Sequence, residues 1–380
     1  MGSTSSGATA RTWAEIDLGA LLENFNLAQA NGRKVMCILK ADAYGHGAVT
    51  CGRFLEAHGA DAFGVACLSE AVELRRAGLT RPILILGYTA PQEAATLAGL
   101  GLSQAVPDEP FAQELAGQAR RAGVRVSVHV KLDTGMSRLG IPAQGPQQAS
   151  EAARAVERLG DLGGLAVDGL FTHFAAADTP EEDSFTVWQL ENYLLVLEEL
   201  TRKGLRPGLC HTSNSACILS HPETQLDMVR EGIMLYGLYP DSLPRHEPLH
   251  PVMTLKSRIV QVRQLPAGAT VSYGRTWQAS APMTCAVVAA GYADGYPRRL
   301  SNQAWVLLNG RRHPQIGRVC MDMSMLDVTG SDVQRGDEVV LFGQGGMSLE
   351  EVAGLVGTIN YEIACLVTAR VPRVYLNGQG

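Results

Sequence analysis

The segment VMCILKADAYGHG, residues 35–47, carries the most information about the fold of this chain. It begins with an apolar run, Val35 to Leu39, whose composition predicts a buried strand. Lys40 follows directly, and a turn of glycine, aspartate and small residues comes next. Burial disfavours the ammonium form of a strand-end lysine, and its free amine can form Schiff bases with carbonyl compounds such as pyridoxal phosphate. The alternative, a lysine that reaches out to solvent, is equally open on this segment alone.

Short apolar strands alternate with amphipathic helical patterns from this segment to about Tyr239. The predicted helices include Glu70–Ala77, Asp108–Ala122 and Ser184–Lys203. The predicted strands are 35–40, 62–66, 83–86, 103–106, 126–132, 165–172, 208–211 and 228–230. This repeated strand–helix unit, within a region of this length, predicts a TIM (β/α)8 barrel in the α/β class, with a doubly wound open sheet as the alternative.

The pattern changes at the proline-rich segment 241–251. Beyond it, apolar and polar residues alternate with a period of two, as in MTLKSRIVQVRQL (253–265) and DEVVLFG (337–343). Glycine and asparagine turns separate these runs, which predicts a mainly β domain with one helix at Leu349–Val356. We therefore expect a tag or linker at residues 1–10, a TIM-barrel domain at 11–243 and a mainly β C-terminal domain at 244–380.

The composition is ordinary for a globular protein. The 380 residues are 46% hydrophobic and 18% charged, with a net charge of −6. Basic residues are scattered and no apolar run is long enough to cross a membrane, so we expect neither a nucleic-acid partner nor a membrane partner. The eight cysteines form no CxxC pair, which favours reduced core residues in a cytoplasmic protein over a disulfide framework or a metal site.

Polar and charged candidates follow the predicted strands of the first domain, where TIM barrels build their sites. They are Lys40, Arg138 in KLDTGMSRLG (131–140), His173 in GLFTH, His211, Asn214 and Ser215 in HTSNSA, and Arg230, Gly232 and Ile233 in MVREGIMLYG. Each residue alone has an ordinary interpretation, such as a core histidine or a surface ion pair. Their coincidence at one face of a barrel favours a functional site.

A phosphate site is expected in the last strand–helix loops of the barrel. Backbone N–H groups and hydroxyls bind phosphate. Ser215, at a predicted helix start, offers a hydroxyl, and Gly232 and Ile233 offer backbone N–H groups. The chain has no Walker-type lysine loop and no GxGxxG motif. In the β domain, Tyr273 in SYGRTW (272–277) fits either an ordinary turn tyrosine or a general acid–base group, and the motif leaves both open.

Taken together, these motifs resemble those of bacterial alanine racemases, which are pyridoxal-phosphate-dependent enzymes of fold type III. LKADAYGHG (39–47) is similar to the cofactor-lysine motif of that family, and the similarity runs from Arg11 to about Val374. The resemblance implies a TIM barrel plus a β domain, and a homodimer with two shared active sites. It also implies interconversion of L-alanine and D-alanine, the latter a peptidoglycan precursor, through an aldimine of pyridoxal 5'-phosphate. The two bases would be Lys40 and Tyr273 of the partner subunit.

The resemblance also assigns further roles residue by residue. The cofactor would be held by Lys40, Tyr44, Arg138, His173, Asn214, Ser215, Arg230, Gly232, Ile233 and Tyr361, with Arg230 facing the pyridine nitrogen. The substrate would be bound by Arg138, Met321 and Asp322. Lys131, carbamylated in many members of the family, would orient Arg138. Asp178, Arg298 and Arg318 would line the entrance.

Three other functions fit the residues less well. A barrel decarboxylase with the same cofactor uses a glycine-rich phosphate loop, and has an acidic residue where Arg230 stands. A non-catalytic pyridoxal-phosphate-binding protein has no β domain. A serine racemase on the same scaffold has a smaller residue in place of Tyr361, so Tyr361 favours alanine, with serine as the alternative substrate. The short C-terminal end leaves open that the chain is excised from a larger protein.

Overall fold

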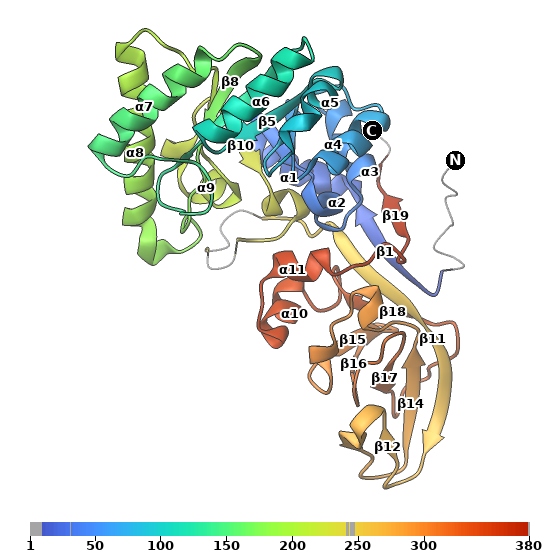
Figure 1. Cartoon of the computed structure of the whole chain (residues 1–380). Helices are drawn as coiled ribbons and strands as arrows, with labels where there is room; N and C mark the ends of the chain where they lie inside the picture. The colour runs from blue at the N-terminus through green and yellow to red at the C-terminus, as the bar shows by residue number, and fades with distance from the viewer. Residues whose placement is uncertain (1–9, 31, 241–242, 244–247, 379–380) are drawn as a thin grey trace.

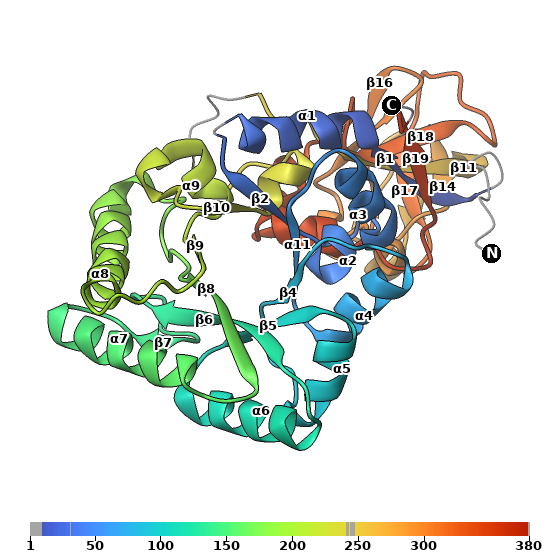
Figure 2. The same ribbon diagram turned by 90° about the horizontal axis from the view of Figure 1, so that it is seen from above.

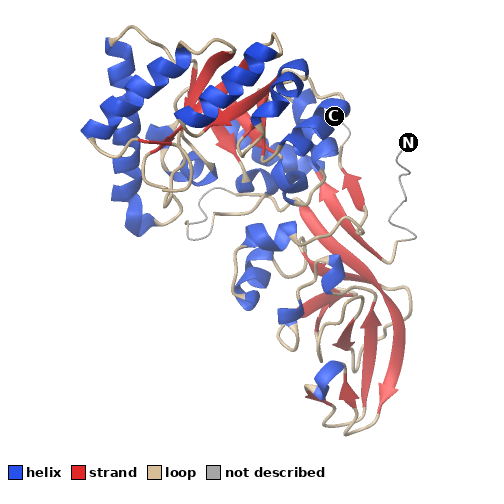
Figure 3. Ribbon diagram, viewed as in Figure 1, coloured by secondary structure: helices blue, strands red, loops and turns tan. Residues whose placement is uncertain are grey.

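The computed structural model describes residues 10–30, 32–240, 243 and 248–378. Figure 1 shows two bodies, and the long strand β11 (Met253–Leu265) runs down the second from its junction with the first. Helices dominate the first body and strands the second (Figure 3). The predicted tag or linker at 1–10 falls, apart from Ala10, outside the described residues. Among the helices that are described, none is long and apolar enough to cross a membrane.

The first body is a nearly closed parallel barrel, seen from above in Figure 2. Its strand order is β10-β2-β3-β4-β5-β6-β8-β9. The bounds are β2 (Lys34–Ile38), β3 (Ala62–Val65), β4 (Ile83–Ile85), β5 (Leu102–Val106), β6 (Val126–Asp133), β8 (Leu165–Phe171), β9 (Leu209–His211) and β10 (Met228–Glu231). Between β9 and β10, backbone bonds from Asp227 N to Cys210 O (3.0 Å) and from Arg230 N to Ser213 O (3.1 Å) join the two ends of the sheet. The predicted TIM barrel is therefore confirmed, and the open doubly wound alternative is wrong.

Amphipathic helices surround these strands. They are α1 (Leu18–Gln29), α3 (Ala48–Ala57), α4 (Leu68–Arg76), α5 (Ala94–Gly99), α6 (Glu109–Arg121), α7 (Pro146–Gly160), α8 (Asp183–Arg202) and α9 (Ser215–Ser220). A short strand, β7 (Ile141–Pro142), adds to β6. Helix α6 illustrates the principle: its buried residues recur at helical spacing, and the Asp108 side chain caps it by accepting from Phe111 N at 2.8 Å.

The turn after β2 departs from the prediction. The predicted strand includes Lys40, but β2 ends at Ile38, and Lys40 begins the short helical segment α2 (Lys40–Tyr44). Ala41, Asp42, Ala43 and Tyr44 all have φ between 51° and 55°, which makes one left-handed turn. Such residues cost roughly 1–2 kcal/mol each. The Glu70 carboxylate supports the turn by accepting from Ala41 N at 2.8 Å and Ala66 N at 2.7 Å.

The second body is a mainly β domain, as predicted. Its strands are β11, β12 (Thr270–Val271), β13 (Trp277–Gln278), β14 (Met283–Val288), β15 (Trp305–Leu308), β16 (Arg311–Pro314), β17 (Ser324–Asp327), β18 (Glu338–Phe342) and β19 (Arg373–Leu376). The predicted helix is present as α10 (Leu349–Val356). A second helix, α11 (Asn360–Cys365), was not predicted, because six residues are too few to show a helical period.

The N-terminal strand β1 (Thr12–Asp17) is an exception to the predicted domain division. It lies within the range assigned to the barrel, yet it pairs with β11 antiparallel and with β19 in parallel. Those partners lie more than two hundred residues away in the sequence, so no local pattern indicates the pairing. For the rest of the chain, we propose that the boundary stays near residue 243.

Candidate active site

A cavity of about 620 Å³ opens at the carboxyl ends of the barrel strands. Predicted residues that line it are Lys40, Tyr44, Lys131, Arg138, His173, Asp178, Asn214, Ser215, Arg230, Gly232, Ile233 and Tyr361. We call it the barrel pocket. It gathers residues from β2 to α11, that is, from nearly the whole length of the chain. The barrel topology, which brings the ends of parallel strands to one face, explains how they meet.

Lys40 contributes an amine to the barrel pocket from the start of the left-handed turn. Its Nζ lies 5.8 Å from the centre of the Tyr44 ring. Burial lowers the pKa of Lys40, and the positive charge of Arg138 lowers it further. A larger fraction of the amine is therefore uncharged at a given pH than in an exposed lysine, so Nζ can serve as a nucleophile or a base.

Arg230 lines the barrel pocket, is buried, and is held by several hydrogen bonds. Its Nη1 donates to His211 O at 2.7 Å, and its Nη2 donates to Thr172 O at 2.8 Å and Thr212 O at 3.0 Å. Nη2 also lies 3.3 Å from His173 Nδ1. Burial lowers the pKa of Arg230 to about 10, which still leaves the guanidinium charged at neutral pH. This residue therefore presents a fixed positive charge at neutral pH.

Two further histidines continue this network into the barrel. His211 Nδ1 lies 3.2 Å from Arg230 Nη1, and His211 Nε2 lies 2.8 Å from His129 Nδ1. The His211 ring stacks on Phe171 with ring centres 4.9 Å apart. His129 is not among the residues that the sequence motifs predicted for the site. It stands two residues before Lys131 on β6, and this period-two spacing, which turns both side chains to the same face, is the signal that could have found it.

Lys131 and His173 share the strongly positive surroundings. Lys131 is 6% exposed, and burial followed by the charges of Arg138 and Arg230 lowers its pKa to about 8. Burial, with the charges of Arg230, Lys131, Arg138 and Lys40, also lowers the pKa of His173 well below its usual value. His173 is therefore neutral at physiological pH. A pocket with four cationic side chains is suited to an anionic ligand.

Two hydroxyls and a backbone amide meet next to β10. Ser215 Oγ accepts from Gly232 N at 3.0 Å. A Cβ at Gly232 would lie 3.4 Å from both Ser215 Oγ and Tyr44 Oη, so the missing side chain leaves a space bordered by two hydroxyls. The Tyr361 ring lies 6.2 Å from that of Tyr44 and lines the same pocket. Asn214 has a local task as well, because its side chain caps α9 by accepting from Cys217 N at 3.0 Å.

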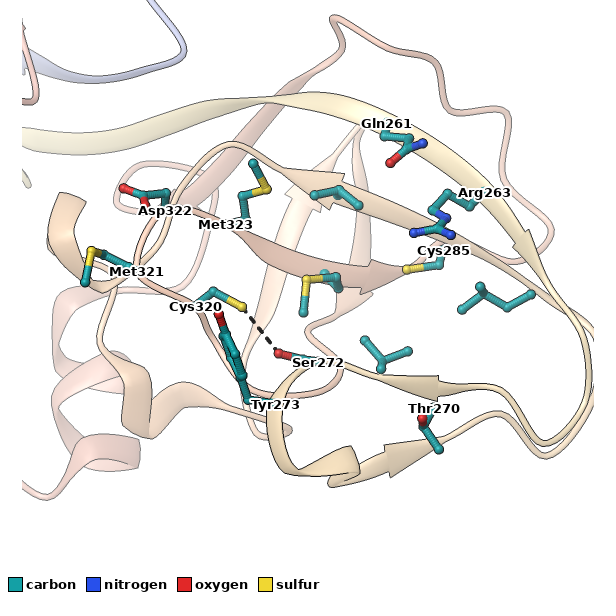
Figure 4. A pocket seen from close by; sticks show the side chains of 14 residues that line it. Gln261, Arg263, Thr270, Ser272, Tyr273, Cys285, Cys320, Met321, Asp322 and Met323 are labelled. Carbon is teal, nitrogen blue, oxygen red and sulfur yellow. Dashed lines mark hydrogen bonds between the residues drawn. The ribbon is translucent and has the colours of Figure 1, made fainter.

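The other predicted residues lie in the β domain around a second cavity, which we call the β-domain pocket. Tyr273, Met321 and Asp322 line it, together with Ser272 and Cys320, as Figure 4 shows. Figure 1 places β12, just before Tyr273, at the end of this domain remote from the barrel. Tyr273 is 69% exposed. Within one chain, therefore, Lys40 and Tyr273 do not share a pocket.

The loop that carries Tyr273 is strained. Ser272 has φ 65° and ψ −173°, a combination that glycine adopts far more readily than other residues. Its Oγ donates to Arg318 O at 2.6 Å and lies 3.3 Å from Cys320 Sγ, the contact dashed in Figure 4. Arg318 is thus next to the Tyr273 loop. Neither Arg318 nor Arg298 lines either pocket, so the predicted entrance residues are not gathered with Asp178 in one chain.

A lysine with a lowered pKa, in a cation-lined pocket at the mouth of a barrel, is typical of a class of barrel enzymes that use a lysine amine as a nucleophile or base. Family models narrow this class. Residues 16–240 match the alanine racemase N-terminal domain, and residues 252–375 match the alanine racemase C-terminal domain. The chain belongs to the alanine racemase family, an enzyme family of isomerases.

Individual alanine racemases are similar to this chain over nearly its full length. The alanine racemase of Desulfovibrio desulfuricans is 44% identical over 369 residues, which are 96% of this chain and 98% of that protein. The solved alanine racemase of Clostridium difficile is 38% identical with a TM-score of 0.91, covering 98% of this chain and 97% of that one. A Bacillus anthracis alanine racemase with bound L-Ala-P is 33% identical with a TM-score of 0.88, over 97% and 96%.

Proposed function

We propose that this protein interconverts L-alanine and D-alanine with pyridoxal 5'-phosphate bound in the barrel pocket. The observation that carries the proposal is the lysine amine of Lys40 in a pocket with three further cationic side chains, in a chain of the alanine racemase family. The relatives reported above are alanine racemases, and no observation favours the serine alternative, so serine is not proposed as the main substrate.

The residues of the pocket fit this cofactor. The space above Gly232, bordered by the hydroxyls of Ser215 and Tyr44, suits its phosphate. Lys40 is the amine for its aldehyde, and the charged Arg230 would meet its pyridine nitrogen. When bound, the cofactor withdraws electrons from the substrate and makes the α-hydrogen acidic. Arg230 does not release its proton at neutral pH, so it would leave the pyridine nitrogen unprotonated and restrain competing reactions.

Two bases would act on opposite faces of the substrate. Nζ of Lys40, whose pKa is lowered by burial, would take or return the α-hydrogen on one face. The phenol oxygen of Tyr273 would do so on the other. Because Tyr273 lies in a separate, exposed pocket of its own chain, we infer that it acts in the partner subunit of a homodimer. Met321 and Asp322 would accompany it and bind the substrate carboxylate.

We also propose that Lys131 is carbamylated. Its pKa of about 8 leaves part of the amine uncharged near neutral pH. The neutral nitrogen would attack carbon dioxide, form a C–N bond and release one proton to solvent. The carbamate would replace a positive charge by a negative one next to Arg138, and so would hold the guanidinium in place. A cytoplasmic enzyme that supplies D-alanine for peptidoglycan is the setting that we propose for this activity.

Activity assays on matched lysine variants test the proposal. The purified protein, incubated with pyridoxal 5'-phosphate, should show the visible absorbance of a lysine-bound cofactor and convert each enantiomer of alanine into the other, followed by chiral chromatography. Lys40→Ala should lose both properties. Lys34→Ala, an exposed lysine at the other end of β2, should retain them. Full activity in Lys40→Ala, or an inactive wild-type protein that carries the cofactor, would overturn the proposal.

A further inference from the structure

In the loop Cys320–Met321–Asp322, which lines the β-domain pocket, each of the three carbonyl groups accepts a hydrogen bond. Cys320 O accepts from Tyr292 N and Met321 O accepts from Ala293 N, both at 3.0 Å. Asp322 O accepts from Arg11 Nη1 at 3.2 Å. The carbonyls of Cys320 and Met321 therefore both point toward the backbone of Tyr292 and Ala293.

The orientation of the carbonyls fixes the orientation of the amides. In a trans peptide the C=O of one residue and the N–H of the next point in opposite directions. The N–H groups of Met321 and Asp322 therefore point outward, and neither has an acceptor among the described residues. Met321 is 53% exposed, so the loop is open to a ligand. Convergent amides of this kind bind anions such as a carboxylate.

One feature of the loop opposes anion binding. The Asp322 side chain, half exposed beside these amides, is a carboxylate itself and would repel another one. Arg370 offsets this charge, because its Nη2 lies 2.8 Å from Asp322 Oδ1. The Nε of Arg370 bonds to Asp294 Oδ1 at 2.9 Å, and Arg11 Nη2 bonds to the same oxygen at 2.7 Å.

Asp294 anchors this arrangement. It is 1% exposed, and its second oxygen accepts from Gly291 N at 3.0 Å. Gly291 contacts the loop so closely that a Cβ there would lie 2.2 Å from Cys320 O. Asp294 thus orients Arg370 from behind, while Arg370 reaches Asp322 in front. The pair Arg370–Asp322 is held by the buried part of the domain and not only by a surface contact.

We propose that Arg370 is a positioning and specificity-determining residue for the substrate carboxylate: it neutralises Asp322 so that the Met321 and Asp322 amides accept an anion. The inference rests on the proposed function, since it takes the substrate to be an amino acid whose carboxylate meets this loop. Arg370 does not touch the reacting atoms. Its loss should therefore affect binding of the substrate more than the chemical step.

Kinetics on charge variants of the holoenzyme test the proposal. Arg370→Gln keeps a donor for Asp294 but removes the charge. It should raise the KM for both enantiomers of alanine by about 3- to 10-fold and leave kcat within about 3-fold, because the half-exposed Asp322 carboxylate would then repel the substrate carboxylate through a partly aqueous medium. The increase should shrink at high salt, which screens exposed charges. Arg311→Gln, the same change on the exposed strand β16, should leave KM unchanged.

The double variant separates charge from structure. In Arg370→Gln with Asp322→Asn the repelling carboxylate is gone, so KM should return to near the wild-type value. A purely structural role for Arg370 would leave the double variant as impaired as the single one, and this result would overturn the proposal. An unchanged KM in Arg370→Gln would also overturn it.

A binding measurement that needs no turnover completes the test. Propionate, which is alanine without its amino group, should bind the holoenzyme with a dissociation constant raised by the same factor in Arg370→Gln when measured by calorimetry. Unchanged propionate affinity counts against Arg370. A wild-type enzyme that binds the cofactor and propionate but fails to racemise alanine would instead contradict the proposed function, so the two failures are distinguishable.

Discussion

The barrel pocket and the β-domain pocket are built in opposite ways. In the barrel pocket Lys131 and Arg230 are buried, and burial together with mutual repulsion lowers the pKa values of Lys40, Lys131 and His173. In the β-domain pocket the side chains of Tyr273 and Met321 are more than half exposed. The first is preorganised within a single chain. The second has its groups on a surface, as expected if, as we propose, this half of the site is completed by the partner subunit.

Subunit mixing is the strongest way to break this comparison. Lys40→Ala and Tyr273→Phe dimers should each be nearly inactive, and exchange of their subunits should restore activity. With random exchange, half of the dimers are mixed and each holds one intact site, so about one quarter of the wild-type activity is expected. Confirmed exchange without recovery would show that both bases act within one chain. Mixing Lys40→Ala with itself is the control.

Carbon dioxide labelling sharpens the account of the barrel pocket. With ¹³C-bicarbonate the protein should show a carbamate resonance by NMR, and Lys131→Met should lack it. The variant should also lose about 10-fold or more in kcat/KM, since a hydrogen bond to a charged group is worth about 1.5–3 kcal/mol. A wild-type spectrum without the resonance would contradict the carbamate.

Substrate choice tests how the two pockets would meet. Tyr361 lines the barrel pocket, and we expect it to face Tyr273 of the partner subunit across the substrate side chain. Tyr361→Ala should raise serine turnover relative to alanine by about 10-fold or more, since one methylene-sized difference is worth roughly 10–200-fold. The variant also removes a proposed phosphate contact, so assays need saturating cofactor. Equal use of serine and alanine by the wild-type enzyme would reject alanine as the preferred substrate.

Backbone strain at Ser272 offers a test of the β-domain pocket. Ser272→Ala keeps a side chain in an unfavourable conformation and loses the bond to Arg318 O, so Tyr273 should be displaced and kcat should fall by about 10-fold. Ser272→Gly relaxes the backbone and should be the more stable variant. With α-deuterated substrates, the kinetic isotope effect of Ser272→Ala should grow only for the enantiomer whose α-hydrogen Tyr273 removes. The other enantiomer should be unaffected, because Lys40 removes its hydrogen and is unchanged in this variant. Equal changes for both enantiomers would argue against a role for Tyr273 on one face.

The smallest effect concerns a buried carboxyl behind the barrel pocket. Burial raises the pKa of Glu231 well above its usual value, and among the described residues neither oxygen has a partner. The protonated carboxyl contributes to the free energy of unfolding below the pKa of the unfolded chain, about 4.3. This contribution is lost as pH rises from that value toward the raised pKa of the folded protein. Glu231→Gln cannot ionise, so its Tm relative to wild type should improve by about 2–5 °C between pH 5 and pH 8. The exposed Glu181→Gln should give no such trend.

Much of the barrel was predictable because its signals are local. The apolar runs placed every barrel strand to within about two residues, and Lys40, Arg230 and Ser215 stood where strands end. What could not be predicted depends on distant contacts. The left-handed turn at Ala41 is held by Glu70, and nothing in small residues such as Ala41 announces it. Arg370 has no motif of its own, and its place beside Asp322 follows only from the folded domain.

The pairing of β1 with β11 and β19 has a consequence for synthesis on the ribosome. This strand is made before the barrel, whereas β11 and β19 follow only after the whole barrel sequence. While the barrel forms, β1 must wait with open edges, and such edges invite pairing with other chains. Completing the sheet is a late, non-local step, which slows folding. We therefore expect nascent chains arrested before β11 to aggregate through β1, although their barrel sequence is complete.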